Sequence, residues 1–201
     1  KKSESLQDVP ISITAFTGDS IRDLGFSDTL SIDEKTPNLE IKTFGGQPNI
    51  FIRGVGNNDF NATTISPVSI YVDDVVMGLT GSQSAQLFDV QRIEVLRGPQ
   101  GTLFGRNTPA GIVKFDTVKP GRGENYVRAS YARFNTINLE GAVGGDLSDV
   151  AAVRLSGLYQ SRSDYVDNLD TAQKDDLEGF DEIALRAQIQ LEPTDDFSLR
   201  L

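Results

Sequence analysis

The chain has 201 residues, of which 38% are hydrophobic and 24% charged, enough for one large core or two small ones. It carries a net charge of −10 and contains neither Cys nor His. These features exclude disulfide scaffolds and sites built from thiolate or imidazole ligands. They also argue against nucleic-acid binding, which needs a basic face, and lower the expectation of catalysis by a histidine base.

No stretch of the chain approaches the roughly 18 consecutive apolar residues of a membrane-spanning helix. A closed β-barrel is the other structure that satisfies every backbone group in lipid. Its overall composition is not strongly apolar, because only alternate residues of each strand need be apolar. The chain opens on Lys1 and stops at Leu201 within an expected strand, so we expect both ends to be cut.

Residues 1–121 are predicted to form a mixed α/β domain of short elements. Alternation of apolar and polar residues and the placement of Gly and Pro indicate each element. A two-residue turn at Asp73 and Asp74 is expected to close a hairpin. The expected elements are a strand at 10–17, a helix capped within 18–20 and ending at Leu24, a helix at 27–35 stopped by Pro37, strands at 39–43 and 49–53, the hairpin at 69–76, and strands at 92–96 and 112–118.

Residues 122–201 are predicted to form four to five long antiparallel strands. The clearest alternation runs through residues 182–192, where Ile183, Leu185 and Ile189 alternate with polar side chains. Each segment has about the 9–11 residues that a tilted strand needs to cross a bilayer. Tight turns are expected at 144–149 and 193–196, and a long acidic connection at 164–181, as in outer-membrane barrels.

A soluble antiparallel sheet with one wet face would show the same alternation. Two features favour the barrel. The polar positions carry Arg, Gln and Glu in long rows, which a wet lumen allows, and the segments exceed the five or six residues of an ordinary strand.

Two strands of the first domain end in the dipeptide Arg-Gly. One is Ile50 to Gly54, and the other is Ile93 to Gly98, which continues as PQGTLFG to Gly105. For a single such strand, an arginine reaching water beside a glycine turn would be explanation enough. With these motifs, QDVP at 7–10, YVD at 71–73 and the segment 111–120, the sequence resembles the TonB-dependent outer-membrane receptors over its whole length.

The resemblance implies a fold, a location and partners. It implies a mainly β protein, with an α+β plug at 1–121 followed by the first strands of a 22-stranded transmembrane barrel. It implies a place in the outer membrane of a Gram-negative bacterium, in contact with its lipid. The partner TonB would act through a box preceding Lys1, and the ligand would be an extracellular small molecule or metal chelate. Asp74, Ala110 and Lys114 depart from the family pattern, which usually has Gly at the first two positions and Asn at the third.

The resemblance also gives the Arg-Gly motifs a role, because in this family their arginines meet carboxylates on the inner wall of the barrel. A plug held by hydrated ion pairs can be loosened, since an exposed pair contributes only about 0–1 kcal/mol. The expected plug–barrel contact residues are Arg53, Gly54, Glu94, Arg97 and Gly98.

Ligand contacts are expected in two polar loops at the apex of the plug. Both are rich in amide, hydroxyl and aromatic groups, although solvated loops would look the same. The expected residues are Asn57, Asn58, Asp59, Phe60, Asn61, Ser82, Gln83 and Ser84. We expect no catalytic residue, no bound metal and no cofactor.

The sequence is therefore interpreted as part of a TonB-dependent transporter that admits a siderophore–iron complex or another large nutrient by displacing its plug, and not as an enzyme. A signalling receptor of the same architecture is the first alternative, and an extra domain before the plug would mark it. A soluble hydrolase that uses paired carboxylates is the second.

Overall fold

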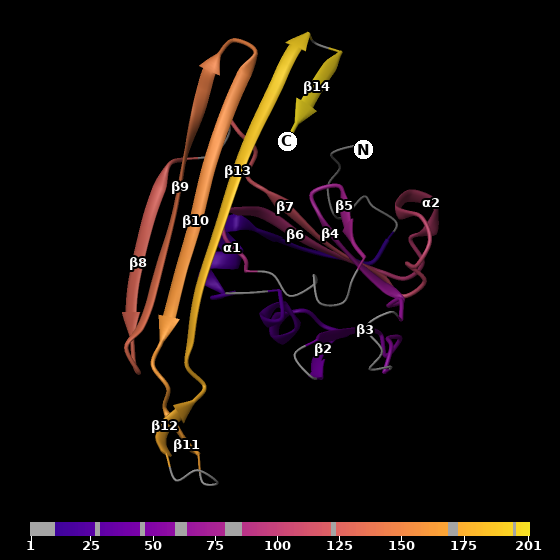
Figure 1. The fold of residues 1–201 in the computed structure, drawn as a ribbon. Coiled ribbons are helices and arrows are strands. Elements are labelled where there is room, and N and C mark those ends of the chain that lie inside the picture. The colour runs from indigo at the N-terminus through magenta and orange to yellow at the C-terminus, as the bar shows by residue number, and fades with distance from the viewer. Residues whose placement is uncertain are drawn as a thin grey trace. The chain divides into compact units, whose positions relative to one another are not determined.

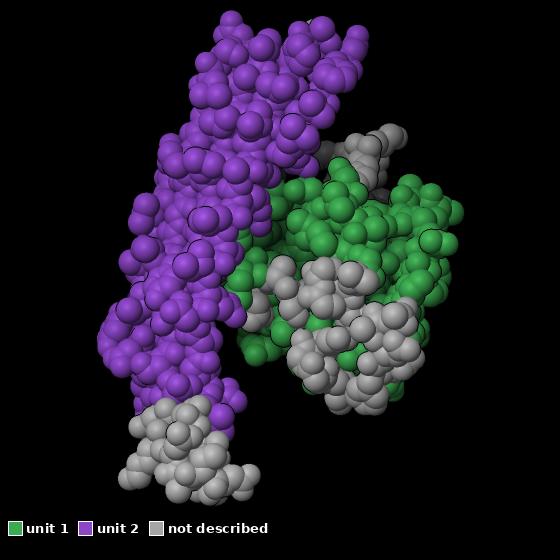
Figure 2. Space-filling view, viewed as in Figure 1, with its two compact units in different colours: residues 1–117 green, residues 118–201 purple. Residues whose placement is uncertain are grey.

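The computed structural model describes residues 11–26, 29–44, 47–58, 64–78, 86–121, 124–168, 173–194 and 196–201. The chain divides into two compact units, Lys1–Thr117 and Val118–Leu201, which Figure 2 shows in different colours. Each unit is built around its own five-stranded sheet. No helix within the described residues is long and apolar enough to cross a membrane.

The first unit contains a mixed sheet in the order β1-β6-β7-β4-β5 (Figure 1). All neighbouring pairs are antiparallel except β4 and β7, which are parallel. A separate antiparallel hairpin is formed by β2 and β3. The strands of this unit are β1 (Ile13–Thr17), β2 (Leu39–Phe44), β3 (Gln47–Ile52), β4 (Val68–Val72), β5 (Val75–Met77), β6 (Val90–Arg97) and β7 (Gly111–Thr117).

One face of the mixed sheet forms the hydrophobic core with the helix α1 (Gly18–Asp23), the 3-10 helix η1 (Ser31–Lys35) and the β2–β3 hairpin. Ile52, Ile93 and Val113 are fully buried at its centre. The rings of Phe16 and Phe26 meet edge to face, with centroids 5.3 Å apart. Burying aliphatic and aromatic side chains of this size stabilises the fold by roughly 1.5–3 kcal/mol each.

The helices of this unit differ from the prediction at their starts. The side chain of Thr17 caps α1 by accepting from the backbone N–H of Ser20 at 3.3 Å, so the cap precedes the expected position. Gly25, with a φ of 73°, follows the helix as expected. The expected second helix is only the 3-10 turn η1, and its predicted start at 27–28 lies outside the described residues.

The glycine-rich segment between β6 and β7 folds back onto β4. It contains a short helix, α2 (Gly101–Phe104), which the sequence did not predict. The hydroxyl of Tyr71 donates to the Phe104 carbonyl at 2.5 Å, and the hydroxyl of Ser69 donates to the Asn107 carbonyl at 2.9 Å. These bonds fix the segment that follows the second Arg-Gly motif.

The second unit contains an antiparallel sheet in the order β14-β13-β10-β9-β8 (Figure 1), which confirms the predicted mainly β fold. Three strands have 12 to 15 residues, longer than the 9–11 that cross a bilayer. Within the connection between β10 and β13 lies a small two-stranded sheet. The strands are β8 (Tyr126–Ala132), β9 (Thr136–Ser148), β10 (Ala151–Arg162), β11 (Val166–Asn168), β12 (Gln173–Leu177), β13 (Phe180–Thr194) and β14 (Phe197–Arg200).

The two faces of this sheet differ in polarity. Val127, Gly141, Gly157 and Leu185 stand opposite one another across four strands, and Val127 and Leu185 are 80% and 83% exposed. The neighbouring row, on the other face, contains Ser156 and Arg186. Large apolar side chains therefore cover one face and meet solvent, while polar side chains cover the other.

Short turns and longer connections alternate between the strands as predicted, but some of their boundaries differ from the prediction. β9 continues to Ser148, so the tight turn expected at 144–149 is only the pair 149–150. Gly144 and Gly145 predict a turn from their residue type, but both pair with β10. The long connection at 164–181 contains β11 and β12.

Substitution of Gly111 by Ala should destabilise the first unit by about 2 kcal/mol or more. A Cβ at this position, where φ is 149°, would lie 2.3 Å from the Leu96 carbonyl oxygen of the neighbouring strand. Hydrogen–deuterium exchange of the β6 and β7 amides in the full-length protein would measure the loss. The control is Gly101→Ala, where nothing lies within 4 Å of the added Cβ and exchange should not change.

Candidate functional site

The first Arg-Gly motif forms a tight two-residue turn at the end of β3. Ile52 and Val55 exchange both backbone hydrogen bonds at 3.0 Å, with Arg53 and Gly54 between them. Both central residues have positive φ, 53° for Arg53 and 76° for Gly54, as the primed hairpin turn requires. The turn presents the Arg53 side chain to solvent.

Arg53 occupies a backbone conformation that suits Asn or Gly better than Arg. A left-handed conformation costs a residue with a Cβ about 1–2 kcal/mol. Such strain persists where the surroundings enforce it, and it is concentrated at functional positions. The turn thus holds Arg53 in a conformation that costs free energy, and the role of its charge stays a prediction.

The chain then doubles back over β3. A Cβ on Gly56 would lie 2.1 Å from an atom of the Phe51 ring, so only glycine permits this close approach. Asn57 and Asn58 follow directly, and Asn58 is exposed. The other expected ligand-contact residues, Asp59, Phe60, Asn61, Ser82, Gln83 and Ser84, lie outside the described residues. The ligand site stays a prediction.

The second Arg-Gly motif is arranged differently, because Arg97 is buried with 7% of its surface exposed. Its guanidinium donates to the Pro37 carbonyl from Nε at 3.1 Å and from Nη2 at 2.8 Å. Nη2 also donates to the Thr14 hydroxyl at 2.8 Å. Gly98, with a φ of 90°, turns the chain toward its bond with the Ala110 carbonyl. Arg97 thus joins β1, β6 and the η1–β2 turn.

The two arginines are linked through one turn. Arg97 holds the Pro37 carbonyl, and the backbone N–H of Arg53 donates to the next carbonyl, that of Asn38, at 2.8 Å. Asn38 makes this possible by adopting a φ of 62°. Thr14 and the Pro37–Asn38 turn lie outside the sequence prediction, and their one signal in the sequence is the Pro-Asn pair, which is typical of turns.

The pair of arginines forms a cationic site. Burial lowers the pKa of Arg97, and repulsion from the Arg53 guanidinium lowers it further. Among the residues that the structure describes, no carboxylate lies within ion-pair distance of either guanidinium. Two neighbouring like charges without a counter-charge are suited to an anionic partner. We name Arg53 and Arg97 the arginine pair.

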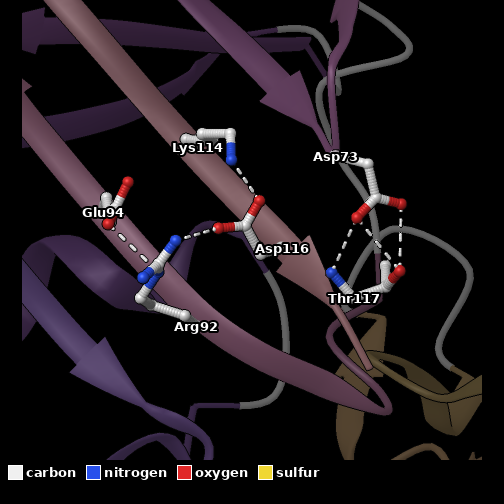
Figure 3. Close-up of polar contacts among 6 residues, drawn as sticks. All are labelled: Asp73, Arg92, Glu94, Lys114, Asp116 and Thr117. Atoms are coloured by element: carbon white, nitrogen blue, oxygen red, sulfur yellow. Dashed lines mark hydrogen bonds and ion pairs between the residues drawn. The ribbon is translucent and has the colours of Figure 1, made fainter. Parts of the chain in front are cut away.

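Glu94 does not belong to this pair. It alternates with Val95 on β6 and so lies on the opposite face of the sheet from the core. Its carboxylate lies 3.0 Å from Nε of Arg92. Figure 3 marks this ion pair with a dashed line. Its expected role in a plug–barrel contact stays a prediction, with Arg92 as a partner that the sequence did not indicate.

Glu94 is part of a network of four charged side chains across β6 and β7 (Figure 3). Nη2 of Arg92 lies 2.7 Å from the Asp116 carboxylate, which also accepts from Lys114. Burial raises the pKa of Asp116, but the hydrogen bonds from Lys114 and Arg92 outweigh it and hold the pKa below its ordinary value. Lys114, whose side chain is 9% exposed, thus has its counter-charge two residues along the same strand.

Asp73 has a structural role at the β4–β5 turn, which confirms the predicted hairpin. With a φ of 55°, it begins the turn, and its N–H donates to the Phe115 carbonyl at 2.7 Å. Its carboxylate accepts from the Thr117 backbone N–H at 3.0 Å and from the Thr117 hydroxyl at 2.9 Å (Figure 3). The hydrolase alternative needs paired carboxylates, and Asp73 instead ties the turn to the end of β7.

Comparison with known proteins gives a consistent result for the first unit. The model of the TonB-dependent Receptor Plug Domain family matches residues 5–112. The pesticin receptor of Yersinia pestis is 34% identical over 113 residues, which cover 55% of this chain and 16% of the receptor. The catecholate siderophore receptor Fiu of Escherichia coli K12 is 25% identical over 176 residues, or 82% of this chain and 21% of Fiu.

The similarity extends to the second unit in a solved structure. The ferric yersiniabactin uptake receptor FyuA of Yersinia pestis superimposes with a TM-score of 0.82 and 26% identity, over 92% of this chain and 29% of FyuA. The chain thus spans less than a third of the length of each of these three relatives.

Substitution of Asp116 by Asn should destabilise the first unit at pH 7 by about 2 kcal/mol, because the buried ammonium of Lys114 loses its charged acceptor. The pKa of Asp116 is lower in the folded protein than its ordinary 3.8, so its ionised form stabilises the fold above pH 3.8. That contribution is lost as the pH falls through the folded-state pKa.

The difference between wild type and Asp116→Asn should therefore be greatest near neutral pH and shrink below pH 3.8. Hydrogen exchange of the β6 and β7 amides across pH would measure it, after correction for the intrinsic exchange rate. Glu34→Gln, at an exposed position, is the control. A difference that stayed constant with pH would contradict this role of Asp116.

Proposed function

Because the chain belongs to the family of TonB-dependent receptors with a plug domain, we propose that it is the plug and first barrel strands of an outer-membrane receptor that takes up a ferric chelate or another large nutrient. The proteins of this family are receptors and transporters and not enzymes. The expectation that the chain catalyses no reaction agrees with this membership.

The membrane assignment rests on one observation, the exposed apolar face of the β8–β14 sheet. Val127, Ile183 and Leu185 are 72–83% exposed on strands that alternate apolar and polar residues. A soluble protein rarely leaves so continuous an apolar face in water. Lipid would remove the cost of this exposure, and further strands would pair with the open edges of β8 and β14. The 22 strands implied by the resemblance remain part of this proposal.

The arginine pair supports a plug that is held by polar contacts and can be displaced. Arg53 is exposed, and in the complete receptor we infer that its partner is a carboxylate on the barrel wall. Arg97 is largely committed to Pro37 and Thr14, so its contribution would be to position the Arg53 turn. An exposed ion pair contributes only about 0–1 kcal/mol, so TonB could break it at low energetic cost.

The names of the relatives favour iron chelates as the ligand class. FyuA is described as a ferric yersiniabactin uptake receptor, and Fiu as a catecholate siderophore receptor. We extend this class to the present chain as a proposal. Ligand contact would include the loop that follows Gly56, with Asn57 and Asn58.

Uptake can be tested with a deletion strain grown under iron limitation on a panel of ferric chelates. We expect at least one chelate to support growth of the parent strain but neither of the deletion strain nor of a strain without TonB. Fractionation should recover the full-length protein from outer membranes only with detergent. Equal growth of all strains on every chelate would contradict the proposed transport, while recovery as a soluble protein would contradict the membrane assignment.

Substitution of Arg53 by Asn separates the charge of this residue from its backbone strain. Asn accepts the left-handed conformation, so the turn itself should gain up to about 1 kcal/mol. Loss of the charge should loosen the plug, so that cells producing the variant admit more of a large antibiotic that the closed receptor excludes. The control is Arg106→Gln, another exposed arginine of the first unit. Unchanged permeability with Arg53→Asn would show that the charge does not hold the plug.

A further inference from the structure

The chain segment that follows the first unit packs closely on the β9–β10 pair of the second unit. Gly121, which has a φ of 69°, lies next to Asp146 and Ala152, two residues that stand opposite each other on β9 and β10. A Cβ at Gly121 would lie 2.6 Å from Asp146 Oδ1 and 3.2 Å from the Cβ of Ala152. Any larger residue would have to displace the Asp146 side chain, so this close approach depends on glycine.

Two hydrogen bonds fasten the next part of the same segment. Nη2 of Arg154, a residue with 2% of its surface exposed, donates to the Glu124 carbonyl at 3.3 Å. The backbone N–H of Gly144 donates to Asn125 Oδ1 at 2.8 Å, just before the first residue of β8. Gly144 and Arg154 stand opposite each other on β9 and β10, so both bonds hold the segment at one place on this strand pair.

The chain is also fastened at the end of the first unit. Thr117, the last residue of β7, is 1% exposed. Its backbone N–H and its hydroxyl donate to the Asp73 carboxylate at 3.0 and 2.9 Å (Figure 3). Residues 118–120 separate Thr117 from Gly121, and the last of them is proline. A proline fixes its own φ and restricts the residue before it, so few backbone angles can change between the two fastened points.

The length of free chain limits how far the end of β7 can move. An extended chain spans about 3.3–3.6 Å per residue. While Gly121 is held on β9 and β10, Thr117 can lie no more than about 14 Å from it. If the contacts of the segment were released, the chain would be free as far as Tyr126, the first residue of β8, and the limit would rise to about 30 Å. These contacts therefore decide between a short and a long displacement.

We propose that the contacts of Gly121, Glu124 and Asn125 with β9 and β10 form a clamp that stays closed while the plug is displaced. We name these contacts the tether clamp. The end of β7 then stays within about 14 Å of Gly121, and the plug rearranges around this fixed end instead of leaving as a whole. Arg154 is a positioning residue, because it acts through the segment that it holds. The inference rests on the proposed function, since it takes TonB to displace the plug.

The test measures how accessible a cysteine beside the tether clamp is in living cells. Ala152→Cys places a thiol next to Gly121, where it should react slowly with a maleimide while the clamp is closed. The chain contains no other cysteine, and any elsewhere in the full-length receptor is replaced. In cells without TonB, adding Arg154→Gln or Asn125→Ala should raise the labelling rate about fivefold, the change that loss of one ordinary hydrogen bond gives.

Two matched controls separate the clamp from a general loss of structure. Asn125→Asp keeps an accepting oxygen, so the labelling rate should stay that of the parent. Arg128→Gln removes an arginine that contacts the Tyr126 ring and the Glu140 carboxylate, on β8 and β9, and it should also leave the rate unchanged. Thermal unfolding of each variant, and growth of the parent Ala152→Cys strain on the chelate, check that the receptor is intact.

Cells that take up a ferric chelate give the decisive comparison. We expect the labelling rate of Ala152→Cys to be the same with and without the chelate and with and without TonB, because the clamp stays closed. A rate that rises only when the chelate and TonB are both present would overturn the proposal. Labelling of both Arg154→Gln and Asn125→Ala at the parent rate in resting cells would also overturn it, because the contacts would then not hold the segment.

Failure of the proposed function would give a different result. No ferric chelate would then support TonB-dependent growth, whereas labelling in resting cells would still decide whether Arg154 and Asn125 hold the segment. A receptor that takes up a chelate while its Ala152→Cys thiol becomes exposed would keep the proposed function and lose the tether clamp.

Discussion

The turn at Pro37 and Asn38 is the constraint on which the arginine pair depends. It offers two successive carbonyls, one to the Arg97 guanidinium and the next to the Arg53 backbone. Two positive charges are thereby fixed at the ends of β3 and β6, although they repel each other and burial already disfavours one of them. Such an arrangement raises the energy of the isolated plug slightly and would be relieved by an anionic surface. In the proposed function, that surface would be a carboxylate of the barrel wall.

The mixed sheet separates this pair from the other charges of the plug. Its core face is apolar, and its opposite face carries Arg92, Glu94, Lys114 and Asp116, which neutralise one another. The network has no net charge, so it needs no external partner, and its ion pairs hold β6 and β7 together. One set of charges is balanced within the unit, and the other, where β3 and β6 end, has no carboxylate within ion-pair distance among the residues that the structure describes.

Local pattern predicted much of this fold, because alternation and turn residues act over a few positions. The β4–β5 hairpin, the long strands β9, β10 and β13, and the exposed Arg53 follow from such signals. The burial of Arg97 could not be predicted, since its acceptor on Pro37 is 60 residues away in sequence. The helix α2 was overlooked because Gly and Pro predict loops, whereas Tyr71 and Ser69 on a distant strand hold this segment in place. Gly144 and Gly145 predict a turn, but both pair with β10, and at Gly144 a Cβ would lie 2.5 Å from the Val153 carbonyl oxygen.

The second unit also exposes groups that would be costly to leave in water, and over a larger surface than the arginine pair. Its apolar face and the free edges of β8 and β14 would be costly in water, and its polar face carries side chains that a lipid environment would exclude. The proposed arrangement, with lipid on one side and a wet interior on the other, would satisfy both faces. In the proposed receptor, the exposed charge of Arg53 is the group through which the first unit would meet a carboxylate of the barrel wall.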